Sequence, residues 1–223
     1  MWLRRTQSCA LKIWLLLVVN AFGFSLPVFG GYAKVYEIYG PEFRLSLKEA
    51  QVFHEKAEEL YYKGDYAGAA SAINSARELT EKTLGPEHRD LAVIFETVAE
   101  GYVIRGEFEN VDAFLQRSLA IGEKTLGTNH PIIARTLRGM TGLAVIQGDL
   151  PKAEACLERC LRIQMASYPP KHPALGTSLQ IGGLLRLMQG RYDEATIALN
   201  QSSSYVETLL GRDNFSLIGY SCG

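Results

Sequence analysis

Apolar and polar residues alternate along most of the chain with the period of an α-helix that buries one face. In the stretch 108–126, apolar and small residues fall at i, i+3, i+4, i+7 and i+8, which form a single stripe on a helix. The residues of that stripe are Val111, Phe114, Leu115, Ser118 and Leu119. The same offsets hold Ala153, Cys156, Leu157, Cys160 and Leu161 in a second stretch, and Ala195, Ala198, Leu199, Ser202 and Ser203 in a third. The pattern predicts amphipathic helices that repeat along the chain.

Residues that break helices separate these stretches, and they recur at a fixed step of 42 positions. One set of glycines comprises Gly64, Gly106, Gly148 and Gly190, and a second comprises Gly85, Gly127 and Gly211, with Pro169 in the remaining place. His88, His130 and His172 keep the same step. A fixed period of roughly 20 to 50 residues indicates a solenoid of repeated units.

Each unit is predicted to contain two helices, here called helix A and helix B. Helix A ends just before a glycine of the first set, because glycine takes the left-handed conformation that terminates a helix at no steric cost. The predicted ranges of helix A are 47–63, 89–105, 131–147 and 173–189, and those of helix B are 66–84, 108–126, 150–167 and 192–210. Ser46 and Glu49 have the spacing of a capping box at the start of the first helix.

The connections within each unit are short, so its two helices are expected to be antiparallel. Neither helix can bury its apolar stripe alone, and the units must therefore stack on one another. The sequence predicts an all-α fold, a solenoid of about four antiparallel helix pairs.

The units resemble the tetratricopeptide repeats of the kinesin light chain type. The resemblance rests on the order aromatic, Ala, Leu, small, Leu after the first glycine, and on the run EK-x-LG-x-x-HP that ends at Pro131. It also rests on small-residue columns, which comprise Ala57 and Ala99 in helix A and Ala69, Ala153, Ala195 and Ala76 in helix B. The resemblance covers about 46–223. It implies a right-handed superhelical solenoid whose helices A line a concave face, and a protein or peptide ligand on that face.

Residues 1–30 differ in character from the rest. Arg4, Arg5 and Lys12 precede an apolar run over 13–24, and small residues follow near Gly30. This order is typical of a secretory signal peptide, which predicts a secreted or periplasmic protein. An uncleaved membrane anchor is the main alternative, and a buried helix is a further one.

The remainder divides into a linker at 31–45 and a repeat domain at 46–223. The linker carries Tyr32, Val35, Tyr36 and Tyr39 as its apolar residues. The repeat domain is expected to comprise units at about 46–87, 88–129, 130–171 and 172–213, followed by a partial fifth helix over 214–222. Solenoids usually close with a polar capping helix, and none is evident in this sequence.

The charge balance argues against a nucleic-acid partner. The chain has 23 Lys and Arg against 24 Asp and Glu, a formal net charge of −1, and the two signs are interspersed. Phosphate binding needs clustered Lys and Arg, which the sequence lacks. The expected partner is a protein or peptide, with no membrane contact beyond an uncleaved anchor.

The resemblance places three columns of helix A on the concave face. They supply the candidate partner-binding residues Gln51, His54, Glu58, Glu96, Glu100, Arg135, Arg138 and Gln180. An acidic patch from the first two units would lie beside a basic patch from the third and orient a peptide that carries both charges. The alternative is an ordinary solvated helix face. In either case, reversing Arg135 and Arg138 to Glu is expected to leave the fold intact. The columns hold no Asn, so the backbone-clamping mode of many kinesin-type repeats is not expected.

Other reactive residues are interpreted as structural. The three histidines lie one unit apart, about 10 Å, and so cannot share a zinc ion that needs ligands at about 2.1 Å. Their expected place is the turn into helix A, with Pro131 and Pro173 at its first position. Cys156 and Cys160 fall in packing columns, and the pair Gly182 and Gly183 is expected to allow close helix packing.

No catalytic motif is present, so we expect no enzyme activity, no cofactor and no metal. The favoured function is a non-catalytic scaffold that binds a protein or peptide in the concave groove, outside the cytoplasm. One alternative is the repeat region of a larger protein with an enzymatic, peptidase-like part. Another is a structural protein that associates with itself through an uncapped C-terminal end.

Overall fold

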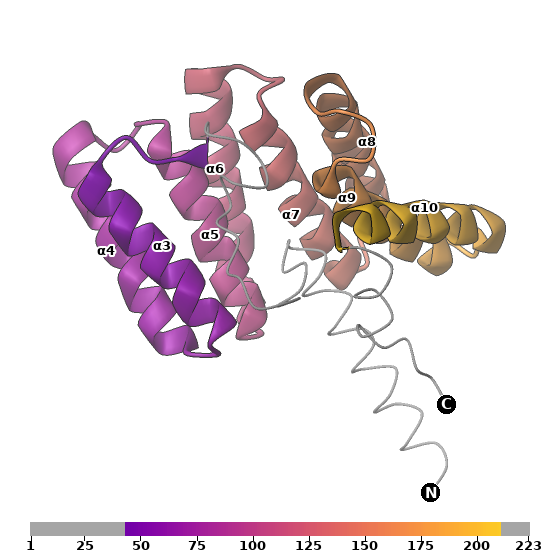
Figure 1. Cartoon of the computed structure of the whole chain (residues 1–223), viewed down its shortest axis with the longest axis horizontal. Coiled ribbons are helices and arrows are strands. Elements are labelled where there is room, and N and C mark those ends of the chain that lie inside the picture. The colour runs from indigo at the N-terminus through magenta and orange to yellow at the C-terminus, as the bar shows by residue number, and fades with distance from the viewer. Residues whose placement is uncertain (1–42, 211–223) are drawn as a thin grey trace, which may run out of the picture.

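The protein is described here by a computed structural model, which covers residues 43–210 and is helical throughout that range apart from its connections (Figure 1). The helices A are α3 (Lys48–Tyr62), α5 (Asp90–Ile104), α7 (Pro131–Gln147) and α9 (Pro173–Met188). The helices B are α4 (Tyr66–Leu84), α6 (Val111–Leu126), α8 (Leu150–Ser167) and α10 (Tyr192–Leu210), with a 3-10 turn at Phe108–Asn110 ahead of α6. Residues 43–210 contain no strand, which confirms the all-α prediction.

The helix pairs follow one another in chain order across the molecule, from α3 and α4 at one end to α9 and α10 at the other (Figure 1). Within each unit the two helices pack along their length, and between units helix B packs on the next helix A, as α4 does on α5 and α6 on α7. One apolar cluster joins the first two units and the start of α7, and a second runs from α5 to α9. Each stripe is therefore buried by a neighbouring unit, as stacking requires.

Glycine ends the helices A as the sequence predicts. Gly64, Gly106, Gly148 and Gly190 have φ angles of 79°, 72°, 77° and 77°. At Gly148 the N–H bonds back to the carbonyl of Val145 at 3.1 Å and closes the last turn of α7. A residue with a Cβ is strained at such angles, which explains why glycine recurs there.

His130 and His172 are the N-caps of α7 and α9, and His88 lies one residue before the N-cap of α5, so their expected place in the turn is confirmed. Nδ1 of His88, His130 and His172 accepts a hydrogen bond from the backbone N–H two residues further on. Those donors are Asp90 at 3.2 Å, Ile132 at 3.3 Å and Ala174 at 3.2 Å. Residues 43–210 contain no group of three His, Cys, Asp or Glu side chains that could hold a metal ion.

The predicted capping box at Ser46 is wrong. The N-cap of α3 is Leu47, and no side chain caps that helix end. Ser46 instead donates from its N–H and its hydroxyl to the two carboxylate oxygens of Asp90 on α5, at 2.5 and 3.2 Å. Two hydrogen bonds to the carboxylate of Asp90 stabilise Ser46 here more than the one hydrogen bond of a local cap would. A local sequence pattern cannot reveal a partner so distant in sequence.

A further set of polar side-chain contacts joins neighbouring units within the core. The Ser118 hydroxyl donates to the carbonyl of Ala92 at 2.7 Å and lies 2.8 Å from the hydroxyl of Thr136 on the next helix A. One unit later, Cys160 Sγ repeats the contact to Ala134 O at 3.1 Å. Cys160 is fully buried, and burial raises the pKa of its thiol to about 11. Its predicted role in packing is confirmed.

Gly183 shows why small residues stand inside α9. A Cβ there would lie 2.6 Å from Cγ of Leu199 on α10. This confirms the close packing expected for the glycine pair.

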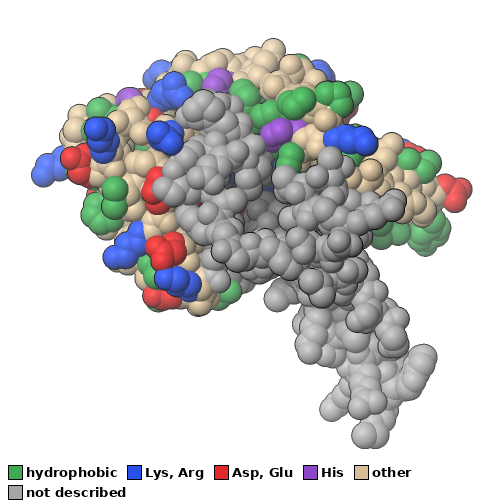
Figure 2. Space-filling view, viewed as in Figure 1, with side chains coloured by type: hydrophobic (Ala, Val, Ile, Leu, Met, Phe, Trp, Pro, Cys, Tyr) green, Lys and Arg blue, Asp and Glu red, His purple; other side chains and the backbone are tan. Residues whose placement is uncertain are grey.

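Figure 2 shows acidic, basic and hydrophobic side chains interspersed over the α3 and α4 side, and hydrophobic side chains together with a few charged ones on the α10 side. Within 43–210, no helix is both long and apolar enough to cross a membrane. The predicted signal peptide at 1–30 and the partial fifth helix at 214–222 lie outside the described residues.

Candidate partner-binding face

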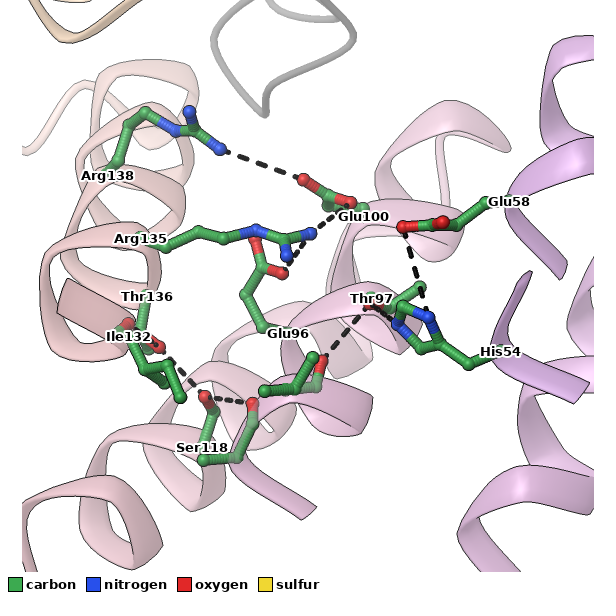
Figure 3. Close-up of polar contacts among 12 residues, drawn as sticks. His54, Glu58, Glu96, Thr97, Glu100, Ser118, Ile132, Arg135, Thr136 and Arg138 are labelled. Atoms are coloured by element: carbon green, nitrogen blue, oxygen red, sulfur yellow. Dashed lines mark hydrogen bonds and ion pairs between the residues drawn. The ribbon is translucent and has the colours of Figure 1, made fainter. Parts of the chain in front are cut away.

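Helices α3, α5 and α7 bring their polar side chains together in one buried layer (Figure 3). His54 and Glu58 come from α3, Glu96 and Glu100 from α5, and Arg135 and Arg138 from α7. All six belong to the columns that the sequence assigns to the concave face. The structure brings these six side chains from three successive helices A close to one another.

The acidic and basic side chains are paired rather than arranged as two separate patches. Nη2 of Arg135 lies 2.6 Å from Oε2 of Glu96 and 3.2 Å from Oε2 of Glu100. Nη2 of Arg138 lies 3.9 Å from Oε1 of Glu100. Figure 3 shows the two arginines reaching from α7 toward the carboxylates of α5. The ion pairs join the second unit to the third.

Seven of the eight candidate residues are buried, contrary to the exposure expected from the sequence. Arg138 is only 1% exposed and Arg135 only 4% exposed, and Gln180 is the one member of partial exposure. Reversal of Arg135 and Arg138 would place four carboxylates together out of water, so with these side chains buried we now expect it to destabilise the fold. The sequence pattern carried no information on how deeply these side chains are covered.

His54 forms the contact between α3 and α5. Its Nε2 lies 3.0 Å from the hydroxyl of Thr97, and that hydroxyl lies 3.1 Å from the carbonyl of Val93. Since the hydroxyl hydrogen of Thr97 is used on Val93, Nε2 of His54 is the donor. Its Nδ1 lies 3.9 Å from Oε1 of Glu58. Burial, reinforced by the nearby Arg135 charge, lowers the pKa of His54 to about 4, so the ring is neutral at pH 7.

The pKa of Glu100 is shifted in the opposite direction from that of His54. Burial, and then the negative charge of Glu96, raise the pKa of its carboxyl well above the usual value, while Arg135 and Arg138 oppose that rise. Arg138 also donates from Nη1 to the Thr177 hydroxyl on α9 at 3.1 Å. Polar contacts thus tie each helix A to the next, from α3 to α9.

Two residues that sequence reasoning missed lie against this face. Phe43 and Leu45 precede α3, in the segment interpreted as a linker, yet they are 2% and 5% exposed. The Leu45 N–H donates to Oε1 of Gln51 at 2.6 Å, and Cζ of Arg135 lies 5.6 Å from the centroid of the Phe43 ring. The sequence does show apolar residues at alternate positions, Phe43 and Leu45, just after Pro41. A pattern of two residues is too short to predict which helix they contact.

The helix pairs, their capped starts, their glycine ends and the polar face of the helices A define an α-solenoid of the helical-repeat class. The chain belongs to the tetratricopeptide repeat family, because the family model described as "Tetratricopeptide repeat" matches residues 90–166 and 142–207, more than half of the chain. No curated protein matches the chain in sequence.

Solved structures agree with this fold. The crystal structure of BtubC (BKLC) from P. vanneervenii is similar with a TM-score of 0.61 at 16% identity, over 74% of this chain and 68% of that one. A crystal structure of a substituted form of a Podosopora anserina putative kinesin light chain with nearly identical TPR-like repeats is similar with a TM-score of 0.60 at 21% identity, over 75% of this chain and 80% of that one. At these identities the likeness concerns the fold.

Proposed function

We propose that the chain is a non-catalytic scaffold that holds a protein or peptide in the concave groove formed by its helices A, outside the cytoplasm. Membership of the tetratricopeptide repeat family supports a role in protein–protein interaction. The basic, apolar and small segments of residues 1–30 support an extracytoplasmic location, because that order is typical of a secretory signal.

The observation that carries the proposal is the charged layer between α5 and α7. Buried ion pairs stabilise a fold little, or less than apolar residues of the same volume would. The other ion pairs between units, such as Lys152 with Asp112 and Arg159 with Glu123, are partly exposed, and the core between units consists mainly of Leu, Ile, Val and Ala. A charged peptide that competes for these pairs would explain why both signs are placed on one face, which folding alone does not require.

Affinity capture from the envelope or secreted fraction of the source cell tests the proposal. Gln180 on α9 is the candidate residue with partial exposure, so Gln180→Arg adds a charge at the groove without breaking a buried ion pair. Gln116→Arg is the matched control, because Gln116 is exposed on α6, a helix B. We expect the wild type and Gln116→Arg to retain the same partner and Gln180→Arg to retain at least about tenfold less of it, a difference worth about 1.4 kcal/mol.

The outcome that overturns this assignment is equal retention by all three proteins, which would move the binding surface away from the helices A. Loss of the partner from Gln116→Arg alone would move it to the helices B. Circular dichroism of each variant shows that a loss of capture is not a loss of fold.

A further inference from the structure

The chain ahead of α3 runs into the same face that the proposed function assigns to a partner. Phe43 is almost wholly buried, and the guanidinium of Arg135 stands over its ring. Arg135 belongs to α7, which lies two units beyond the helix that Phe43 precedes. Phe43 is therefore not a local cap of α3, and it reaches along the row of helices A.

Hydrogen bonds fix the course of this segment. The Leu45 N–H bonds to the side chain of Gln51 on α3, and the Ser46 N–H bonds to Asp90 on α5. Gln51 and Arg135 stand at the same position of their units, and Val93, between them, belongs to the apolar cluster that contains Phe43. The segment thus lies along one column of the helices A, held by backbone bonds to side chains and by an aromatic anchor, which are contacts that a bound peptide also makes.

We propose that residues 43–46 form an intramolecular ligand of the concave groove, anchored by Phe43, and that a partner must displace them to bind. The inference rests on the proposed function, because it assigns to this segment the groove in which a partner would lie.

The covalent link gives the segment an advantage over any partner in solution. A flexible tether holds a ligand at an effective concentration of the order of millimolar. If the segment itself binds the groove with micromolar affinity, the apparent affinity of any partner falls about a thousandfold, and it recovers when the anchor is weakened. A side chain that only completes the core would act differently, because its removal would lower stability without opening a binding site.

A labelled peptide of residues 32–47, YAKVYEIYGPEFRLSL, tests the proposal by fluorescence anisotropy with the full chain. The proteins are the wild type, Phe43→Ala and the control Phe53→Ala, which removes a partly exposed phenylalanine from α3. We expect Phe43→Ala to bind the peptide at least about tenfold more tightly than the wild type and Phe53→Ala do. The same peptide with alanine in place of its phenylalanine should lose that binding.

Equal binding by the three proteins, or no binding by any of them, overturns the proposal. If circular dichroism shows that Phe43→Ala is unfolded, Phe43→Leu retains the apolar volume, removes the ring from Arg135, and is held to the same criteria.

The capture experiment separates this inference from the proposed function. A partner retained equally by the wild type and by Phe43→Ala, with no peptide binding, would refute the intramolecular ligand and leave the scaffold intact. Peptide binding by Phe43→Ala without capture of any partner would support the ligand and contradict the scaffold.

Discussion

At the scale of residues, burial determines the protonation states of His54 and Glu100, which lie on the face between α3 and α7. His54 is held neutral and Glu100 is held toward its protonated form for the same reason, since each would lose hydration as an ion. The two groups respond to acid in opposite directions. A folded-state pKa of His54 below the ordinary 6.5 removes stability as the pH falls, whereas a raised pKa of Glu100 adds stability on the same change.

The substitution His54→Gln is expected to remove part of the acid sensitivity of the fold. Between pH 6.5 and about 4 this histidine is protonated in the unfolded chain but stays neutral in the folded chain. The folded state of the wild type should therefore lose up to about 3 kcal/mol of unfolding free energy over that window, at about 1.4 kcal/mol per pKa unit. Urea unfolding at pH 7 and pH 4.5 measures the loss, with Glu100→Gln as the background that silences the opposing group. The assignment fails if His54→Gln loses as much stability as the wild type.

Arg135→Glu should lower the unfolding free energy by about 3 kcal/mol or more. The change removes the partner of Glu96 and Glu100 and adds a third buried carboxylate beside them. Arg162→Glu is the control, because Arg162 on α8 is paired only at the exposed surface and should change stability by less than about 1 kcal/mol. Thermal unfolding compares the two, and similar melting temperatures would show that Arg135 does not bear a buried charge.

At the scale of elements, the sequence predicted what depends on local chemistry. Helices α4, α7, α8 and α10 have the predicted bounds, since glycine, His-Pro and the apolar stripe act within a few residues. Helix α6 starts later than predicted because Phe108–Asn110 forms a tighter turn. Contacts between distant segments, such as that of Phe43 with Arg135, were not predictable, because a repeat period specifies neighbours within the array but not what covers its face.

Gly106→Val should destabilise the fold by more than about 1 kcal/mol. Gly106 has φ of 72° at the end of α5, and a β-branched side chain is strained there. No atom lies within 4 Å of the site that a Cβ would take, so the cost is one of backbone conformation and not of space. Gly106→Asn, which tolerates this conformation better, is the control. Equal unfolding midpoints for the valine and asparagine variants would contradict the explanation.

At the scale of the whole molecule, the two ends of the array have different surfaces. Glu49 and Lys56 of α3 occupy the columns that Leu91 and Val98 occupy in α5, where both are buried. The first described unit therefore presents charge at positions where the next unit presents apolar residues. These charges oppose the stacking of another unit, although the exposed Val52 on the same flank does not.

The last described unit has the opposite character. Leu187 of α9 is 40% exposed, whereas Val145 in the same column of α7 is 2% exposed. Tyr192 and Ile197 add exposed apolar surface on α10. Head-to-tail association, the structural alternative raised by the sequence, would have to join this end to the charged flank of α3.

Replacing Glu49 by Leu and Lys56 by Val should promote that association. The double variant gives α3 the apolar columns of an internal helix A, which the α10 end can then contact in a head-to-tail manner. Light scattering should show a mass that rises with concentration for this variant. The wild type and the control Glu78→Leu with Lys82→Val, changed on exposed positions of α4, should not show such a rise. An unchanged mass for the α3 variant would mean that its charges do not control stacking.

Hydrogen–deuterium exchange of the chain with and without its captured partner tests the central claim, that the partner lies along the helices A. We expect slower exchange in α5, α7 and α9 and faster exchange at the amides of Leu45 and Ser46, whose hydrogen bonds to Gln51 and Asp90 are lost when the segment is displaced. Slower exchange confined to the helices B, with no change at Leu45 and Ser46, would contradict it.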